Sequence, residues 1–248
     1  MPDTTEITIK VVDSPNLPIQ PPHHPVYSSP SWKFWKTTEG RLVFFVPDQR
    51  PVLQLVVEPD FSCGEVVGDF SAFPNENCYP LENLDIRLLS AWLASLGDVM
   101  LHASGVLVNG RGFCFIGASG AGKSTLAARL IKTAGATVLG EDQIVLRYLD
   151  GRFWMYGTPW HLQEGMCSPE KVPLEKLFFI NKGEPEGIHS ISGMDGVKQL
   201  MQTAFIPYHL QEYLPRILDH LVLLADQVPF YSISYKLKTD PWPMIESA

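Results

Sequence analysis

The chain has 248 residues, of which 45% are hydrophobic and 19% are charged, with a formal net charge of −8. This length and balance are typical of one large globular domain, or of one domain with an appended segment. The negative charge argues against a nucleic-acid partner, because binding nucleic acid requires cations that neutralise a run of phosphates. There is no signal-peptide pattern and no apolar stretch long enough to cross a bilayer, so we expect a cytoplasmic protein without a membrane partner.

The first 80 residues divide by composition. Residues 1–30 are rich in proline, which disfavours helix and interrupts sheet pairing, so we expect an extended or partly disordered arm there. Residues 31–80 read as a β-rich extension, in which three alternating or apolar stretches are typical of strands: 31–36, 42–46 and 52–57. The last part of this extension, residues 60–80, is predicted to be mainly loop.

A core over residues 81–248 is predicted to follow, and it begins with a helix over 81–96. Pro80 stands at the start of this helix and Gly97 ends it. Large apolar side chains recur at every fourth position and form one stripe: Leu84, Leu88, Trp92 and Leu96. The helix is therefore expected to pack against the core and to carry no chemistry.

A β-hairpin comes next, centred on Asn109-Gly110, the strongest short-range signal for a two-residue turn. Such a turn pairs Val108 with Arg111, and the same register brings His102 opposite Gly117. His102 is thus predicted to lie beside the glycine-rich segment that follows, as an acid/base aid or as a neighbour of a bound phosphate. A purely structural role for this histidine is the alternative.

The glycine-rich segment fits the phosphate-binding pattern G-x-x-x-x-G-K-[ST] at every fixed position. An apolar run typical of a buried strand precedes it, and a helical pattern over 124–132 follows it. The segment, termed the glycine loop, consists of Gly117, Ala118, Ser119, Gly120, Ala121 and Gly122, and it leads into Lys123, Ser124 and Thr125.

This segment predicts a site for ATP and Mg²⁺. Glycines allow backbone N–H groups to point at phosphate oxygens, and the start of the helix adds the positive end of its dipole. Lys123 is expected to reach the β- and γ-phosphates, and the Ser124 hydroxyl is expected to bind Mg²⁺. A tight turn without a ligand needs neither the lysine nor the hydroxyl.

Two adjacent carboxylates, Glu141 and Asp142, follow a predicted strand over 136–139. At the end of a strand just beyond the phosphate-binding helix, one carboxylate can hold Mg²⁺ while the other accepts a proton from an attacking hydroxyl. The alternative is a solvated acidic turn. We interpret the pair as a metal-and-base site.

The rest of the chain adds elements without a chemical motif. They are a hairpin over 144–156, a rigid turn over 157–161, a buried strand over 177–180, a loop over 182–196, a helix over 217–226 and a closing strand over 230–235. Strands and helices therefore mix throughout the predicted core.

Several of these segments together resemble the HPr kinase/phosphorylase-like group. They are Leu101-His102-Ala103-Ser104-Gly105-Val106, the Asn109-Gly110 turn, the glycine loop through Thr125, Gly140-Glu141-Asp142 and Gly157-Thr158-Pro159-Trp160. The resemblance covers roughly residues 80–240. The series of histidine, hairpin, glycine loop and acidic pair is more specific than the loop alone.

The resemblance implies an α/β fold: a P-loop kinase core related to phosphoenolpyruvate carboxykinase, with a mixed sheet and flanking helices, preceded here by the β-rich extension. It implies an ATP- and Mg²⁺-dependent kinase that phosphorylates a serine hydroxyl. It also implies Glu141 as general base, Asp142 near the metal and His102 close to the base. The family pattern has an aspartate where Glu141 stands, so this side chain is one methylene longer.

The acceptor stays open between a peptide, a small protein and a small hydroxylated metabolite. The E-x-R-G stretch and the separate N-terminal domain of the bifunctional HPr enzymes are not found in the sequence. Two other functions also stay open: a P-loop ATPase, although no L-S-G-G-Q-like signature is present, and a non-catalytic nucleotide-binding regulatory module. The oligomeric state, a homo-oligomer included, is likewise open.

Overall fold

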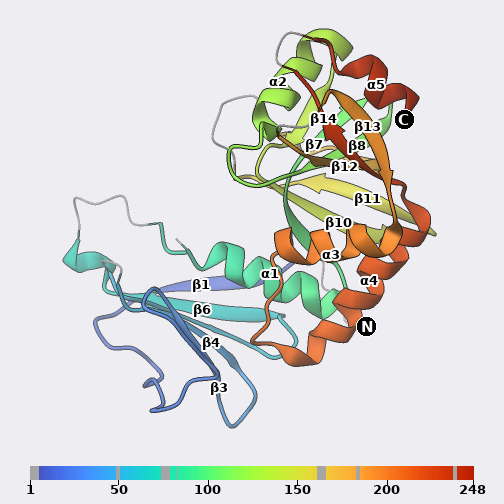
Figure 1. Cartoon of the computed structure of the whole chain (residues 1–248). Helices are drawn as coiled ribbons and strands as arrows, with labels where there is room; N and C mark the ends of the chain where they lie inside the picture. Colours follow the sequence, from blue (N-terminus) through green and yellow to red (C-terminus); the bar gives the residue numbers. More distant parts are fainter. Residues whose placement is uncertain are drawn as a thin grey trace. The chain divides into compact units, whose positions relative to one another are not determined.

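The computed structural model describes residues 6–48, 51–73, 79–81, 83–160, 166–182, 185–236 and 239–248. His161, the last residue of the predicted rigid turn, lies outside these ranges. The chain divides into two compact units, Met1–Trp92 and Leu93–Ala248, termed the first and the second unit (Figure 1). Over the described ranges, no helix is long and apolar enough to cross a membrane.

The first unit is built on a six-stranded sheet. Its strands are β1 (Thr8–Asp13), β2 (Tyr27–Ser28), β3 (Lys33–Lys36), β4 (Leu42–Val46), β5 (Leu53–Val57) and β6 (Cys63–Gly68). They are ordered β1-β6-β5-β4-β3-β2, and a 3-10 helix over Phe70–Ala72 follows β6. The three strands predicted in this part of the chain are present as β3, β4 and β5.

Three strands of this sheet correct the sequence predictions, and one of them is β2, which lies in the proline-rich arm and pairs antiparallel with β3. β1 contains no proline, and it pairs in parallel with β6, with Thr8 opposite Cys63. The expected interruption of sheet pairing is therefore wrong for this part of the proline-rich arm. The expected loop after β5 is wrong for β6, where glycines weaken the strand pattern. An added Cβ at Gly64 would lie 2.7 Å from the Val56 carbonyl oxygen, so the strand needs a glycine there.

The proline-rich segment after β1 covers part of the sheet. The buried side-chain amide of Gln54, on β5, accepts a hydrogen bond from the Ile19 N–H at 3.0 Å and donates one to the Ile19 carbonyl at 2.7 Å. Leu17 and Ile19 pack against a buried apolar group that includes Trp35 and Phe45. Trp35 is thus an anchor of the core of the first unit.

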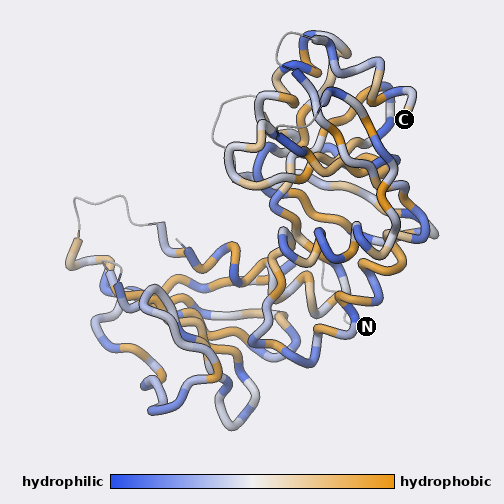
Figure 2. The backbone as a smooth tube through the Cα atoms, in the orientation of Figure 1, coloured by the Kyte–Doolittle hydropathy of each residue, from blue (hydrophilic) through white to orange (hydrophobic). Residues whose placement is uncertain are grey.

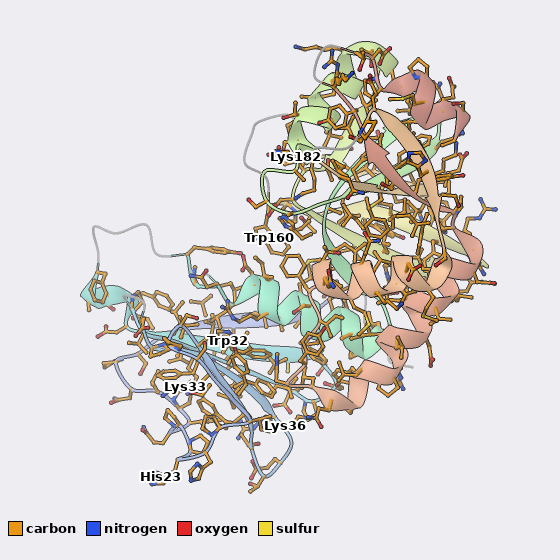
Figure 3. All side chains as sticks on the ribbon, in the orientation of Figure 1. His23, Trp32, Lys33, Lys36, Trp160 and Lys182 are labelled. Carbon is orange, nitrogen blue, oxygen red and sulfur yellow. The ribbon has the colours of Figure 1, made fainter. Side chains whose placement is uncertain are left out.

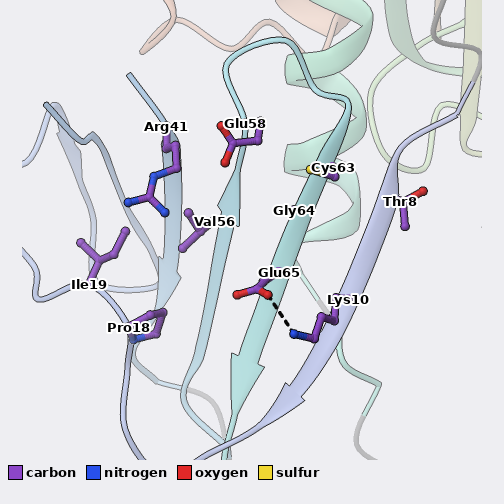
Figure 4. A pocket seen from close by; sticks show the side chains of 10 residues that line it. All are labelled: Thr8, Lys10, Pro18, Ile19, Arg41, Val56, Glu58, Cys63, Gly64 and Glu65. Atoms are coloured by element: carbon purple, nitrogen blue, oxygen red, sulfur yellow. Dashed lines mark hydrogen bonds and ion pairs between the residues drawn. The ribbon is translucent and has the colours of Figure 1, made fainter. Parts of the chain in front are cut away.

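A hollow of about 320 Å³ in the first unit is lined by residues of β1, β5 and β6 together with Pro18, Ile19 and Arg41 (Figure 4). Its lining carries charges of both signs, and Lys10 on β1 forms an exposed ion pair with Glu65 on β6 at 3.2 Å. Exposed ion pairs contribute little to stability because water screens them. The pairing of β1 with β6 therefore depends mainly on backbone hydrogen bonds.

The second unit contains an eight-stranded sheet. Its strands are β7 (Val99–Val108), β8 (Arg111–Ile116), β9 (Thr137–Gly140), β10 (Gln143–Leu149), β11 (Arg152–Gly157), β12 (Lys171–Ile180), β13 (Gly187–Ile191) and β14 (Phe230–Ser234). They are ordered β11-β10-β7-β8-β12-β14-β13, while β9 pairs with β7 and β11 also pairs with β12. The pairs β8–β12 and β12–β14 are parallel, whereas the hairpins β7–β8 and β10–β11 are antiparallel.

Helices cover both faces of this sheet, so the fold is mixed α/β. Among the residues that the structure describes, the α-helices are α1 (Asp85–Leu96), α2 (Lys123–Ala134), α3 (Gly193–Thr203), α4 (Leu214–Gln227) and α5 (Trp242–Ser247), with a 3-10 helix over Gln211–Tyr213 before α4. One buried cluster joins α2 and α5 to Phe113 and Phe178, and another joins α3 and α4 to Leu101 and Phe179. The hydrophobic stretches of the strands in Figure 2 supply these clusters.

The loop predicted over 182–196 is wrong, because this segment contains β13 and the start of α3. Ser192 caps the helix, and its hydroxyl accepts a hydrogen bond from the Asp195 N–H at 3.2 Å. An added Cβ at Gly196 would lie 2.0 Å from the Phe230 ring, so glycine lets α3 approach β14 closely. The glycines that weaken the helical pattern in the sequence therefore serve packing.

His220 on α4 is buried, and its ring meets the Phe153 ring edge-on with the centroids 5.0 Å apart. Burial lowers the pKa of His220 from 6.5 to about 4, because the charged imidazolium would lose its hydration. The unfolded chain therefore binds this proton more readily than the folded chain. Stability is full above the unfolded-state pKa and is lost as the pH falls toward the folded-state value.

Lowering the pH from neutral to about 5 is expected to cost roughly 2 kcal/mol of unfolding free energy through His220 alone. This part of the loss of unfolding free energy at low pH should disappear in His220→Leu. His189→Leu, which replaces an exposed histidine on β13, is the matched control and should keep the loss. Urea titrations at several pH values measure the difference, and equal pH dependence of wild type and His220→Leu would contradict the prediction.

Candidate functional site

The glycine loop joins β8 to α2, so the predicted strand and helix stand on either side of it. Gly120 and Gly122 have φ angles of 73° and 107°, a conformation that side chains strongly disfavour. Gly122 is also the residue that precedes α2, and its carbonyl oxygen accepts a hydrogen bond from the Tyr235 hydroxyl at 2.9 Å. The loop conformation thus depends on glycines at specific positions, and β14 is followed by a tyrosine that holds it.

Lys123, the first residue of α2, folds back into the glycine loop and is 7% exposed. Its ammonium donates a hydrogen bond to the Gly117 carbonyl oxygen at 2.8 Å and contacts the Ala118 carbonyl oxygen at 3.5 Å. Its Nζ also lies 2.9 Å from His102 Nε2. Burial lowers the pKa of Lys123, and the carboxylate of Asp142 opposes this shift.

His102 lies where the hairpin register predicts. The observed pairs run from Val108 opposite Arg111 to Ala103 opposite Ile116, so His102 is the next residue on β7 as the glycine loop begins. Its Nδ1 lies 3.2 Å from Asp142 Oδ1. Because the lysine ammonium can only donate, Nε2 acts as acceptor and the proton of the neutral ring lies on Nδ1, facing the carboxylate.

The charge state of this histidine is set by its surroundings. Burial lowers the pKa of His102, the positive charge of Lys123 lowers it further, and the negative charge of Asp142 partly opposes both effects. Lysine, histidine and carboxylate thus form one chain of contacts that begins inside the glycine loop. The structure brings together three of the predicted site residues: His102, Lys123 and Asp142.

The two predicted carboxylates differ in exposure. Both lie in the connection between β9 and β10, where Glu141 is 1% exposed while the Asp142 side chain is 37% exposed. Asp142 is the carboxylate that contacts His102. The Asp142 backbone is fixed as well, because its carbonyl accepts a hydrogen bond from the Ala103 N–H at 3.1 Å.

A divalent cation at this site would need oxygen ligands. Asp142 offers a half-exposed carboxylate and Ser124, in the first turn of α2, offers a half-buried hydroxyl. Both are hard oxygen donors of the kind that Mg²⁺ prefers, and Mg²⁺ commonly keeps waters and substrate phosphates as its other ligands. In the part of the chain that the structure describes, no group of three histidine, cysteine or acidic side chains is placed to hold a metal alone. The donor set therefore fits a metal that arrives with phosphates.

Two cavities flank the glycine loop within the second unit. One, of about 660 Å³, reaches from His102 and Gly117 to Phe205 and the last turn of α3. The other, of about 370 Å³, lies beside Gly120, Gly122 and the start of α2. Ile180 and Asn181, at the end of β12, line both cavities. The loop thus presents its two sides to two separate spaces.

Lys182, which follows β12, is a site residue that the sequence analysis missed. Its ammonium contacts the Gly120 carbonyl oxygen, and Figure 3 shows it at the glycine loop. The preceding Asn181 is held by its N–H, which donates to the Ile233 carbonyl at 2.9 Å, and by its side-chain amide, which donates to the Ser232 hydroxyl at 2.7 Å. An apolar strand ends just before Lys182, but the local sequence does not indicate that this strand pairs in parallel with β8.

A comparison with protein-family models finds no match. A comparison with curated proteins finds no match either. Among solved structures, 57 chains match, and one of them is the Hpr(Ser) kinase/phosphatase from Coxiella burnetii. That structure is 12% identical in sequence, and the match covers 60% of this chain and 86% of that chain with a TM-score of 0.37.

Proposed function

We propose that the second unit binds a nucleoside triphosphate together with Mg²⁺ and transfers the γ-phosphate to a hydroxyl group. The observation that carries this proposal is the contact chain from Lys123 in the glycine loop through His102 to Asp142. A glycine-rich turn needs none of these three side chains. A cation, an imidazole and a carboxylate gathered at one strand-to-helix loop favour phosphate chemistry.

The groups of the loop would bind the phosphates. Backbone N–H groups of the glycine loop and the start of α2 supply partial positive charge. Lys123 would exchange its carbonyl and His102 contacts for phosphate oxygens, since the ammonium gains more from a charged acceptor. Ser124 and Asp142 are the residues that would hold Mg²⁺, which neutralises charge on the phosphates when bound.

The transfer step needs an acceptor oxygen and a base. The acceptor oxygen bonds to the γ-phosphorus while the bond to the β,γ-bridging oxygen breaks, the diphosphate leaves with that electron pair, and the hydroxyl proton passes to a protein group. Glu141 as this base stays a prediction. His102 lines the larger cavity and contacts the half-exposed Asp142 carboxylate, so the acceptor hydroxyl belongs next to this histidine.

Transfer of label from γ-labelled ATP tests the proposal. With Mg²⁺ present, the acceptors are free serine, HPr, seryl peptides and a control without acceptor. A labelled acceptor would support phosphoryl transfer and name the substrate class. Label released only as phosphate would instead favour an ATPase. Tight ATP binding with neither transfer nor hydrolysis would overturn the transfer reaction in favour of a regulatory module.

We expect Lys182 to contribute to the binding of the outer phosphates of ATP and not to the binding of the rest of the nucleotide. Lys182→Met is expected to weaken ATP binding roughly tenfold, because a cation beside the loop is lost. AMP binding, which lacks the outer phosphates, should change little. The control Lys198→Met removes an exposed lysine that pairs with Asp195 on α3 at 3.1 Å and should leave both affinities unchanged. Isothermal titration calorimetry measures them, and equal losses for ATP and AMP would contradict the assignment.

A further inference from the structure

The larger cavity has a lining that sets it apart from the rest of the site. His102 and Gly117 stand at one end, and the side chains of Asn181, Gln199, Gln202 and Phe205 line the remainder. Apart from His102, none of its lining side chains in the described part of the chain is ionisable. His102 itself already faces Asp142 at 3.2 Å. The polar groups that face this space are therefore mainly carboxamides.

The smaller cavity on the other side of the loop is cationic by contrast. It is lined by Lys182 and Lys236 together with Gly120, Gly122 and Thr125. Anionic phosphates are favoured by such cations and by the start of α2. The nucleotide therefore belongs on this side, with its terminal phosphate reaching Lys123, and the larger cavity is left for the second substrate.

We propose that the larger cavity is the acceptor site and that it takes an uncharged hydroxyl compound, rather than an anionic or zwitterionic one. This inference rests on the proposed phosphoryl transfer. The cavity touches Gly117, whose carbonyl holds Lys123 at 2.8 Å, so a hydroxyl in it lies next to the position of the γ-phosphate. The volume of about 660 Å³ suits a small molecule or one residue with its flanking groups.

The carboxamides explain the choice of an uncharged acceptor. Each amide side chain offers donors and an acceptor, which match hydroxyl and amide groups of a neutral compound. A carboxylate or ammonium entering the same cavity would give up hydration, and the lining side chains other than His102 carry no charge to replace it. The Thr203 hydroxyl also lines this cavity. It already donates to carbonyl oxygens of its own helix at 3.2 and 3.3 Å, so it does not compete with the carboxamides for hydrogen bonds to the second substrate. A bound triphosphate would further repel an anion.

The experiment compares matched neutral and charged acceptors with γ-labelled ATP and Mg²⁺. Glycerol is paired with D-glycerate, and N-acetyl-L-serinamide is paired with L-serine. The neutral member of each pair is expected to have a kcat/KM at least about tenfold higher. Glycerol against the serinamide then tells whether the hydroxyl comes from a polyol or from a seryl group flanked by amides. Preference for the charged member, or equal use of both, would overturn the inference.

A charge-introducing variant gives the second readout. Gln199→Lys places a cation on the half-buried position of α3 that lines the cavity, and it should raise the use of D-glycerate relative to glycerol roughly tenfold. Gln227→Lys, on the exposed end of α4, is the matched control and should not change the ratio. An unchanged ratio in Gln199→Lys would overturn the inference.

Calorimetry with ATP distinguishes a failure of the proposed function from a failure of the proposed acceptor chemistry. If the wild-type protein does not bind ATP, both the proposed function and the acceptor site are overturned. ATP binding with transfer to a charged acceptor alone would overturn only the acceptor chemistry. ATP binding without transfer to either neutral compound would also overturn the acceptor chemistry.

Discussion

Lys123→Ala is expected to abolish measurable phosphoryl transfer and to weaken ATP binding by about two orders of magnitude. The ammonium would form charge-assisted hydrogen bonds with phosphate oxygens, each worth about 1.5–3 kcal/mol. The side chain is 7% exposed and its ammonium donates to the Gly117 carbonyl at 2.8 Å, so truncation to alanine removes a cation from the inside of the glycine loop. Calorimetry with ATP and transfer from γ-labelled ATP measure the two effects.

Lys132→Ala is the matched control for this variant. It removes an exposed lysine from the last turn of the same helix, α2, and should leave ATP binding and transfer unchanged. Wild-type affinity in Lys123→Ala would show that the nucleotide does not bind in the glycine loop. A loss in both variants would point to a change in α2 itself, which a thermal unfolding scan of each protein would reveal.

The second large effect is expected from the two carboxylates. Glu141→Gln should lower turnover by roughly two to four orders of magnitude while sparing ATP affinity, as removal of a general base does. Asp142→Asn should also lower turnover, because Asp142 faces His102 at 3.2 Å, and it should weaken the Mg²⁺-dependent part of ATP binding if its carboxylate holds the metal as we propose. Single-turnover kinetics and calorimetry at varied Mg²⁺ measure the difference.

The burial of Glu141 makes this comparison decisive. Glu141 is 1% exposed, whereas Asp142 is half-exposed and contacts His102. Wild-type turnover in Glu141→Gln would remove Glu141 as the base and leave that role to the pair of His102 and Asp142. Asp150→Asn is the control, since it changes a carboxylate at an exposed turn with a φ of 52°, a conformation that asparagine adopts readily. It should leave turnover unchanged.

The parts of the fold that the sequence predicts well are those set by local chemistry. Asn109 and Gly110 have φ angles of 51° and 78°, as the two-residue turn requires, and this turn alone fixes the register that brings His102 to the glycine loop. Gly135 ends α2 in the left-handed conformation that favours glycine at this position. Turn and cap positions require backbone conformations that only a few residue types adopt readily, so these residues can be interpreted without knowing the tertiary structure.

The parts that were missed depend on packing between distant segments. α3 contains two glycines that argue against a helix, yet Gly196 is required because Phe230 lies against it. Ser192 caps this helix by accepting a hydrogen bond from the Asp195 N–H at 3.2 Å. β6 is also difficult to predict, because Gly64 weakens its strand pattern in the sequence although it allows the close approach to Val56.

The candidate site likewise combines residues that local sequence predicts with residues that only packing between distant segments brings together. The glycine loop, His102 and the acidic pair follow from motif and register. Lys182, Gln199 and Phe205 reach the site only because β12 runs parallel to β8 and because α3 packs beside it. Parallel pairing joins strands far apart in sequence, so their loop residues carry no local signal of being neighbours.

The parallel pairing of β1 with β6 has a consequence for how the first unit assembles. Lys10 and its partner Glu65 are separated by 55 positions in the chain, so β1 can dock only after a long loop has closed. Loop-closure entropy makes this step about 2 kcal/mol more costly than joining β4 to β5 through their short connection. β1 therefore attaches last to a sheet already formed by its neighbours, and its amide protons should exchange with solvent before those of β4 and β5.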